Sequence, residues 1–155
     1  MHRLILKKYH FIDNYNLNKF NNLGRDTCLI WRSKHAQKNI DLIVKTALLC
    51  KRKKIKFYLA NNFKLAIKLK LDGVYISAFN KNFRGNCYLL KKQFNIIGSA
   101  HNQQELSIKK KQNVKEIFLS PIFKTKAGKH LGIYSLKNLF NNFSGKKIAL
   151  GGINK

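Results

Sequence analysis

LSPIFKTKAGKHLGIYSLKNLF, residues 119–140, is the stretch on which the fold assignment depends. The end of an apolar strand leads into a polar loop that holds the chain's only proline, Pro121, together with Thr125, three lysines and two glycines, and an amphipathic helix follows. Such a loop lies at the carboxyl end of a strand, where α/β folds place ligands, and its backbone amides and lysines suit a phosphate. The stretch therefore predicts an anion-binding loop on an α/β scaffold.

The bulk composition predicts one domain over residues 1–155, because 155 residues with 45% hydrophobic content can bury one good core. No run of about 18 apolar residues occurs, so no membrane partner is expected. The N-terminal MHRLILKKYHFI is too short and too charged for a signal peptide. The three cysteines are odd in number and far apart, which argues against a disulfide framework or a zinc site. We expect a cytoplasmic protein.

The net charge of +26 comes from 32 basic and 6 acidic residues, a balance that raises the hypothesis of nucleic-acid binding. The basic residues are mostly lysine, however, whereas bidentate recognition of phosphates and bases favours arginine. The abundance of asparagine, isoleucine and phenylalanine fits an AT-rich genome, and the aromatic residues fall at core periodicity rather than as a stacking platform. Nucleic acid is therefore expected to bind only through nonspecific charge, and a surface selected for a polyanion is the alternative.

Short apolar runs alternate along the chain with segments of helical periodicity. The predicted strands are residues 9–13, 27–31, 55–60, 73–77, 94–98, 114–120 and 146–150. The predicted helices are residues 14–26, 37–53, 63–70 and 102–111, the helix in the opening stretch, and a short one over 88–92. Asn61 or Asn62 is expected to cap the helix 63–70, and Asn102 the helix 102–111.

Seven strands that alternate with helices imply parallel pairing through right-handed crossovers. Periodicity leaves two architectures open, an open doubly wound sheet and a β/α barrel. Polar groups stand at the carboxyl end of nearly every strand. They favour the barrel, because the loops of that face converge on one site.

Four motifs, SAHNQQEL, SPIFKT, HLG and ALGGI, occur in the order and at the intervals typical of one family. In these motifs the chain resembles the thiamine-phosphate synthase and thiazole tautomerase family, over roughly residues 9 to 155. The resemblance implies a (β/α)8 TIM barrel in thiamine biosynthesis. The expected activity is a transferase that joins hydroxymethylpyrimidine diphosphate to thiazole phosphate, giving thiamine phosphate and diphosphate. The implied partners are small phosphorylated substrates.

The resemblance also assigns roles to individual residues near the strand ends. Arg32 and Lys34 match two cations that hold the pyrimidine diphosphate in the family, and Asn61 and Asn62 match its Asn-Asp pair. Ser99 is expected to hydrogen-bond the pyrimidine or the diphosphate.

Further residues are implied in phosphate binding and catalysis. Thr125 and Lys126 are expected to face the thiazole phosphate, with the backbone amides of Gly151 and Gly152 close by. His101 is either an acid/base group, if the chain is a tautomerase, or a helix-capping residue. The implied catalytic set is Ser99, His101 and Lys126.

Two departures from the family pattern are visible in the sequence. The family implies Mg²⁺, but the two carboxylates expected to bind it are amides here, Asn62 and Asn80, and Mg²⁺ is normally held by carboxylates. Asp72 precedes the fourth strand, which suggests a structural role for it.

The chain also stops after the seventh strand, so the eighth strand of the barrel is missing. A truncated coding sequence, a natural continuation, or an oligomer that covers the open edges would account for this. We expect the truncated coding sequence.

Two other functions stay open at this point. A thiazole tautomerase-like isomerase would need only the thiazole phosphate and a proton shuttle at His101. A non-catalytic basic barrel would instead bind phosphate ligands or RNA through its charge.

Overall fold

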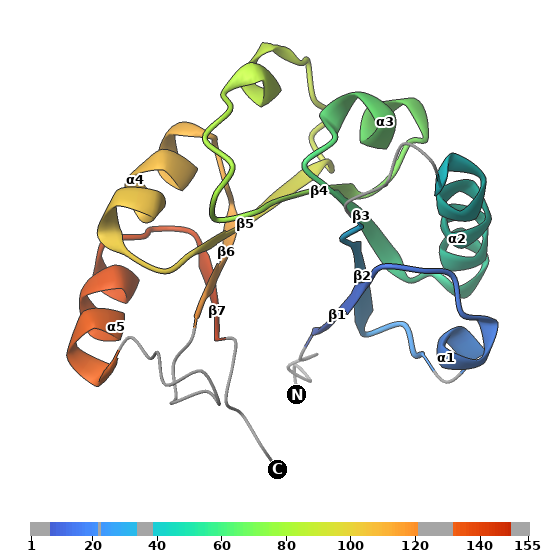
Figure 1. Cartoon of the computed structure of the whole chain (residues 1–155), viewed down its shortest axis with the longest axis horizontal. Coiled ribbons are helices and arrows are strands. Elements are labelled where there is room, and N and C mark those ends of the chain that lie inside the picture. Colours follow the sequence, from blue (N-terminus) through green and yellow to red (C-terminus); the bar gives the residue numbers. More distant parts are fainter. Residues whose placement is uncertain (1–6, 22, 34–38, 121–131, 150–155) are drawn as a thin grey trace. The chain divides into compact units, whose positions relative to one another are not determined.

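The computed structural model describes residues 7–21, 23–33, 39–120 and 132–149 (Figure 1). Strands and helices alternate along the chain, and the seven strands of this described part pair in parallel where their registers are defined. The prediction of a parallel α/β fold is therefore confirmed. The chain divides into two compact units, Met1–Tyr75 and Ile76–Lys155, which are described in turn.

The first unit holds four parallel strands in chain order, with a helix after each of the first three. Its elements are β1 Lys8–Ile12, α1 Leu17–Asn21, β2 Thr27–Trp31, α2 Ile40–Lys53, β3 Lys56–Ala60, α3 Phe63–Lys68 and β4 Gly73–Ile76. The register places Phe11 opposite Ile30, Ile30 opposite Tyr58, and Tyr58 opposite Gly73. Because parallel neighbours in register share a face, these residues form one row across the sheet.

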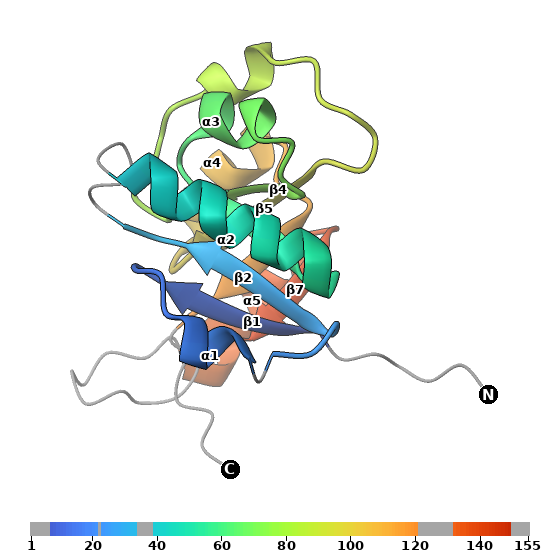
Figure 2. The same cartoon turned by 90° about the vertical axis from the view of Figure 1, so that its right-hand side faces the viewer.

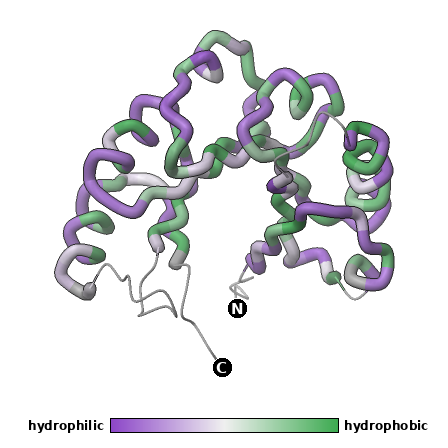
Figure 3. Tube along the Cα trace, in the orientation of Figure 1, coloured by the Kyte–Doolittle hydropathy of each residue, from purple (hydrophilic) through white to green (hydrophobic). Residues whose placement is uncertain are grey.

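The core of the first unit forms where α2 packs on β3 (Figures 1 and 2). Every residue of β2 is buried, which a parallel strand requires, and α2 buries Ile43, Thr46, Leu49 and Cys50 at helical spacing. Figure 3 shows this alternation along α2 as changes between green and purple. Burial raises the pKa of the Cys50 thiol to about 12, and the charge of Asp72 adds to the effect.

Local hydrogen bonds close the ends of these elements. α2 ends at Lys54, whose left-handed φ of 57° lets the Ile55 amide donate to the Cys50 carbonyl at 2.9 Å. The Asp72 carboxylate accepts from the Phe57 amide at 2.9 Å and so joins the start of β4 to β3. The structural role predicted for Asp72 is thereby confirmed.

The second unit holds the last three strands, again parallel and in chain order. Its elements are the short helix η2 Arg84–Cys87, β5 Asn95–Ala100, α4 Gln103–Lys111, β6 Glu116–Leu119, α5 Gly132–Asn141 and β7 Lys146–Ala149. α4 packs on β5, and Gly98 makes this close packing possible. A Cβ at Gly98 would lie 3.0 Å from Val114 Cγ2 and 3.3 Å from Lys109 Cδ.

Three predicted elements differ most from those in the structure. The helix expected over residues 14–26 is only α1, because asparagine side chains there compete for backbone hydrogen bonds. No helix forms over 88–92, since the helical turn lies earlier, in η2, and the backbone is extended at Tyr88. The strand expected to end at Gly98 continues to Ala100, because Ser99 and Ala100 still pair with β6.

None of the helices in the described part of the chain has the length and apolar character that a membrane crossing requires.

Candidate functional site

Arg32 lies directly after β2, at the carboxyl end of the sheet in the first unit. Its backbone amide donates to the carbonyl of Ile12, the last residue of β1, at 2.7 Å. Its guanidinium carbon lies 5.2 Å from the centroid of the Phe11 ring, a cation–π contact. The Arg32 side chain is exposed, so its guanidinium is accessible to solvent while it contacts Phe11. This arrangement suits bidentate binding of a phosphate group.

Two aromatic residues connect Arg32 with the next predicted site residue. The Phe11 and Tyr75 rings meet edge to face, with centroids 5.3 Å apart, and the Tyr75 carbonyl accepts from the Asn61 amide at 2.8 Å. The structure therefore brings Arg32 and Asn61 to one end of the sheet, as the sequence predicted. Sequence reasoning missed Phe11 and Tyr75, because both lie within strands and resemble ordinary core residues.

Asn61 and Asn62 have different local tasks. Asn61 is exposed and adopts a left-handed φ of 56°, a conformation that asparagine tolerates better than most residues. Asn62 caps α3, because its side-chain oxygen accepts from the Leu65 amide at 3.0 Å. Of the two caps proposed from the sequence, Asn62 is the one the structure uses.

The two amides at the expected magnesium positions are both engaged with backbone. Asn62 Oδ1 accepts from Leu65, and Asn80 Oδ1 accepts from the Asn82 amide at 2.8 Å. Within the described residues no group of three or more histidine, cysteine or acidic side chains is placed to hold a metal. Neutral oxygens already committed to backbone donors do not fit Mg²⁺, which prefers free carboxylates.

Ser99 lies within β5 of the second unit rather than after it. Gly98 faces α4, so by the alternation of a strand Ser99 points to the opposite face of the sheet. It is buried and pairs in register with Phe118 of β6. Its expected hydrogen bond to the pyrimidine or the diphosphate stays a prediction.

His101 is held at the start of α4 by Glu105. The Glu105 carboxylate oxygen Oε2 accepts from the His101 amide at 2.7 Å and lies 3.0 Å from the ring nitrogen Nδ1. The Asn102 side chain accepts from the Glu105 amide at 2.9 Å, which confirms Asn102 as the cap. His101 thus takes part in closing the helix terminus, and the same carboxylate fixes its imidazole.

The remaining predicted site residues lie outside the described part of the chain. They are Lys34, Thr125, Lys126, Gly151 and Gly152.

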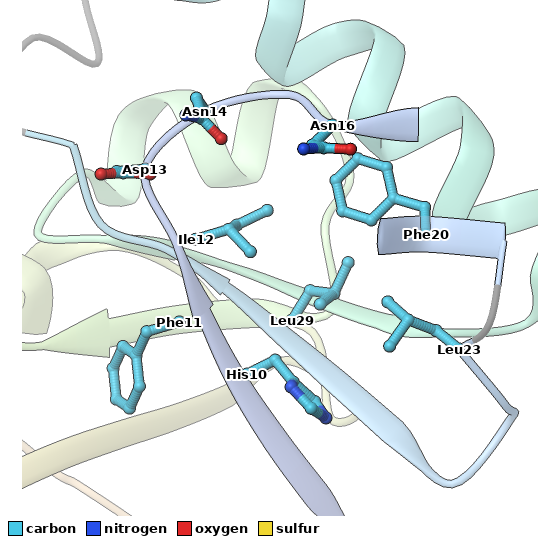
Figure 4. A pocket seen from close by; sticks show the side chains of 9 residues that line it. All are labelled: His10, Phe11, Ile12, Asp13, Asn14, Asn16, Phe20, Leu23 and Leu29. Atoms are coloured by element: carbon cyan, nitrogen blue, oxygen red, sulfur yellow. The ribbon is translucent and has the colours of Figure 1, made fainter. Parts of the chain in front are cut away.

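A hollow of about 320 Å³ lies between β1 and α1 (Figure 4). Phe20, Leu23 and Leu29 form much of its wall, and Asp13 and Asn14 lie at its edge. In Figure 4, Phe11 extends to the other side of β1 from Phe20 and Leu23. None of the predicted site residues in the described part of the chain lines the hollow, although Phe11, which contacts Arg32, is among its lining residues.

Comparison with known proteins places this geometry in context. The family model described as thiamine monophosphate synthase matches residues 21–155. The thiamine phosphate pyrophosphorylase from Pyrococcus furiosus is similar in structure, with a TM-score of 0.69 and 15% sequence identity over 97% of this chain and 77% of that one. A search of curated proteins found no significant match. Because the family model covers most of the sequence, the chain belongs to the thiamine monophosphate synthase family.

Proposed function

We propose that this chain is a transferase that joins hydroxymethylpyrimidine diphosphate to thiazole phosphate, releasing diphosphate and forming thiamine phosphate. Membership of the family supports the reaction class. The observation that carries the proposal is the exposed Arg32 guanidinium stacked on Phe11 at the carboxyl end of β2. The parallel strands in chain order and the likeness to the Pyrococcus protein support a (β/α)8-type barrel as its architecture.

The proposed reaction requires little acid or base chemistry. The bond between the pyrimidine methyl carbon and the diphosphate oxygen breaks, and its electron pair leaves with the diphosphate. The thiazole nitrogen then uses its lone pair to form the new carbon–nitrogen bond. What the protein must supply is neutralisation of the departing charge and close positioning of the two substrates.

Arg32 is the residue we assign to the departing diphosphate. Two parallel N–H groups of its guanidinium match two phosphate oxygens, and the Phe11 ring contacts the guanidinium with its centroid 5.2 Å from the central carbon. Lys34, two residues along the chain, would add a second positive charge. We route no step through a metal, because the amides of Asn62 and Asn80 already accept backbone hydrogen bonds.

The thiazole phosphate is assigned to residues that the family resemblance implies. Thr125 and Lys126 would bind the phosphate together with the amides of Gly151 and Gly152. Ser99, buried on the face of β5 away from α4, would hydrogen-bond the pyrimidine or its diphosphate.

A thiazole tautomerase is the second candidate, and the His101–Glu105 pair favours it. A carboxylate 3.0 Å from Nδ1 holds the imidazole in one orientation, as a proton shuttle requires. In that case thiazole phosphate alone would be isomerised. A His101→Ala variant that isomerises it at the wild-type rate would exclude the tautomerase role.

Diphosphate release with both substrates, measured on the full chain, tests the proposed transferase. We expect Arg32→Ala to lower kcat/KM by about 10-fold to 100-fold, the range for losing a charge-assisted hydrogen bond. Arg25→Ala is the matched control, since Arg25 is also exposed but lies before β2. Absence of product with any divalent metal, together with absence of binding of either substrate, would refute the proposal.

The metal can be tested separately by restoring carboxylates. Asn62→Asp and Asn80→Asp keep a side-chain oxygen for the Leu65 and Asn82 amides, so both caps should survive. We expect wild-type activity to be unchanged by a chelator, and each single variant to bind Mg²⁺ more tightly than the wild type in calorimetry, because it adds one carboxylate. Strong magnesium dependence of the wild type would show that its amides do ligate the ion.

A further inference from the structure

The segment between β4 and β5 carries large apolar side chains on its surface. We call residues 79–92 the aromatic loop; its only regular element is η2, drawn in yellow-green in Figure 1. Phe79 is 78% exposed, Phe83 44%, Tyr88 39%, and Leu89 completely exposed. Single exposed apolar side chains are normal on a monomeric protein, whereas several of them gathered in one short segment are a feature of interaction surfaces.

The aromatic loop is also uniformly basic. The sequence has no aspartate or glutamate between Asp72 and Glu105. Within the loop stand Lys81, Arg84, Lys91 and Lys92, all of them exposed. Cations therefore alternate with aromatic rings along one short segment, which is the composition of a surface for single-stranded nucleic acid.

A buried lysine anchors this loop to α4. Lys109 is completely buried, and its Nζ donates to the Asn80 carbonyl at 2.7 Å and to Gln112 Oε1 at 2.9 Å. Gln112 Nε2 donates to the carbonyls of Asn80 and Asn82, each at 3.0 Å. The side chains of Lys109 and Gln112 thereby hold the backbone on either side of Lys81 in place.

Further hydrogen bonds hold the turn from Asn80 to Asn86. The Asn82 side chain accepts from the Arg84 amide at 2.8 Å, and Asn86 Nδ2 donates to the Lys111 carbonyl at 2.9 Å. These hydrogen bonds fix the backbone of the turn. Phe79 and Phe83 therefore stay at the surface. A rigid platform binds with less loss of conformational entropy than a mobile one.

We propose that the aromatic loop binds single-stranded nucleic acid, with bases stacked on Phe79 and Phe83 and phosphates paired with Lys81 and Arg84. A second copy of the chain is disfavoured as the occupant, because two proteins of net charge +26 repel each other. A lipid surface is disfavoured too, because Asn80, Lys81 and Asn82 stand between the two rings and would have to enter the apolar layer with them. This binding is independent of the transferase activity.

The test uses the full chain and a fluorescein-labelled, unstructured RNA of about 12 nucleotides, with binding followed by anisotropy across a salt series. The double variant Phe79→Ala/Phe83→Ala keeps the charge, so we expect affinity to fall about 10-fold to 100-fold with the same salt slope. Tyr134→Ala is the matched control, since Tyr134 is 86% exposed but lies on α5.

The proposed phosphate contacts of Lys81 and Arg84 are tested with a separate variant. Lys81→Ala/Arg84→Ala should weaken binding and reduce the slope of log affinity against log salt by about 1.4, two single-strand phosphate contacts. Lys51→Ala/Arg52→Ala, in the last turn of α2, removes the same charge elsewhere and should reduce the slope less. Circular dichroism confirms folding of each variant.

Three results would overturn the proposal. One is equal RNA affinity for the wild type and the double phenylalanine variant, since bulk charge alone would then explain binding. Another is an equally tight complex with duplex RNA of the same length, whose bases are not available for stacking. The third is an affinity for phosphatidylserine vesicles that falls by a larger factor in the double phenylalanine variant than the RNA affinity does.

Discussion

Replacing Lys109 by methionine should change how the stability of the protein depends on pH. Burial lowers the pKa of the Lys109 ammonium from 10.5 to about 8, an effect that the charge of Glu105 partly opposes. In the unfolded chain the same amine recovers its ordinary pKa. Between these two values the unfolded state binds more protons than the folded state, so the free energy of unfolding rises with pH.

The size of this effect follows from the two pKa values. A difference of one pH unit corresponds to about 1.4 kcal/mol, so the full gain between pH 8 and pH 10.5 is roughly 3 kcal/mol. The gain is absent below pH 8, where the amine is charged in both states. Between about pH 7.5 and about pH 10 we expect the wild type to gain roughly 2 kcal/mol from this group, and Lys109→Met to gain none of it.

Urea unfolding, followed by circular dichroism at the two pH values, measures the free energy of unfolding of the wild type and of Lys109→Met. Other titrating groups are common to both proteins, so their contributions cancel in the comparison. One of them is the Cys50 thiol, whose raised pKa lowers the free energy of unfolding between pH 9 and about 12. Lys110→Met is the matched control, because Lys110 is exposed on the same helix. Trp31 fluorescence reports the first unit and checks whether both units unfold together. Parallel stability curves for wild type and Lys109→Met would refute the reasoning.

Three further predictions concern packing, capping and thiol reactivity. Gly98→Ala should lower the free energy of unfolding by about 1–3 kcal/mol, because its Cβ meets packed side chains; chemical denaturation measures this, and an unchanged midpoint would contradict it. Asn102→Ala should cost about 1 kcal/mol in the same assay through loss of the cap on Glu105, whereas Asn102→Asp should cost little. A thiol reagent at about pH 8 should label exposed Cys87 and leave Cys50 intact until the protein unfolds, as mass spectrometry would show; equal labelling would contradict the burial.

The strands were predictable because a buried parallel strand is a short, continuous apolar run. TCLIW, residues 27–31, has the same bounds in the sequence prediction and in β2, and all five of its residues are buried. The end of β5 was not predictable in this way. Ser99 is a polar residue that looks like the start of a loop, but it remains in the ladder because its neighbour on β6 is still available for pairing.

The aromatic loop was misread because its conformation depends on distant residues. Lys109 belongs to the run Lys109–Lys111, which in a protein with 32 basic residues resembles an ordinary solvated helix end. Only the fold places its amine under Asn80. From the sequence, residues 88–92 were predicted to form a short helix, and the exposure of the loop's apolar residues could not be inferred.

The sequence predicted the positions of individual site residues, but it did not predict the contacts that connect them. The sequence located Arg32 and Asn61 at strand ends, but the two residues that connect them, Phe11 and Tyr75, belong to strands and look like ordinary core. A contact between β1 and β4 depends on sheet register and curvature, which local patterns do not specify.

The amides at the expected magnesium positions show how one substitution can preserve structure while altering chemistry. Asparagine and aspartate cap a helix or a turn about equally well, because both offer an oxygen to a backbone amide. Asn62 and Asn80 keep this local function, because their side-chain oxygens accept from the amides of Leu65 and Asn82. The hydrogen bonds are therefore retained, but the negative charge of a carboxylate is absent. In the proposed reaction the positive charge that the departing diphosphate requires comes from cationic side chains, and Arg32, which contacts Phe11, is the predicted cation that lies in the described part of the chain. The rate of the proposed transfer should therefore depend more steeply on Arg32 than on any divalent ion.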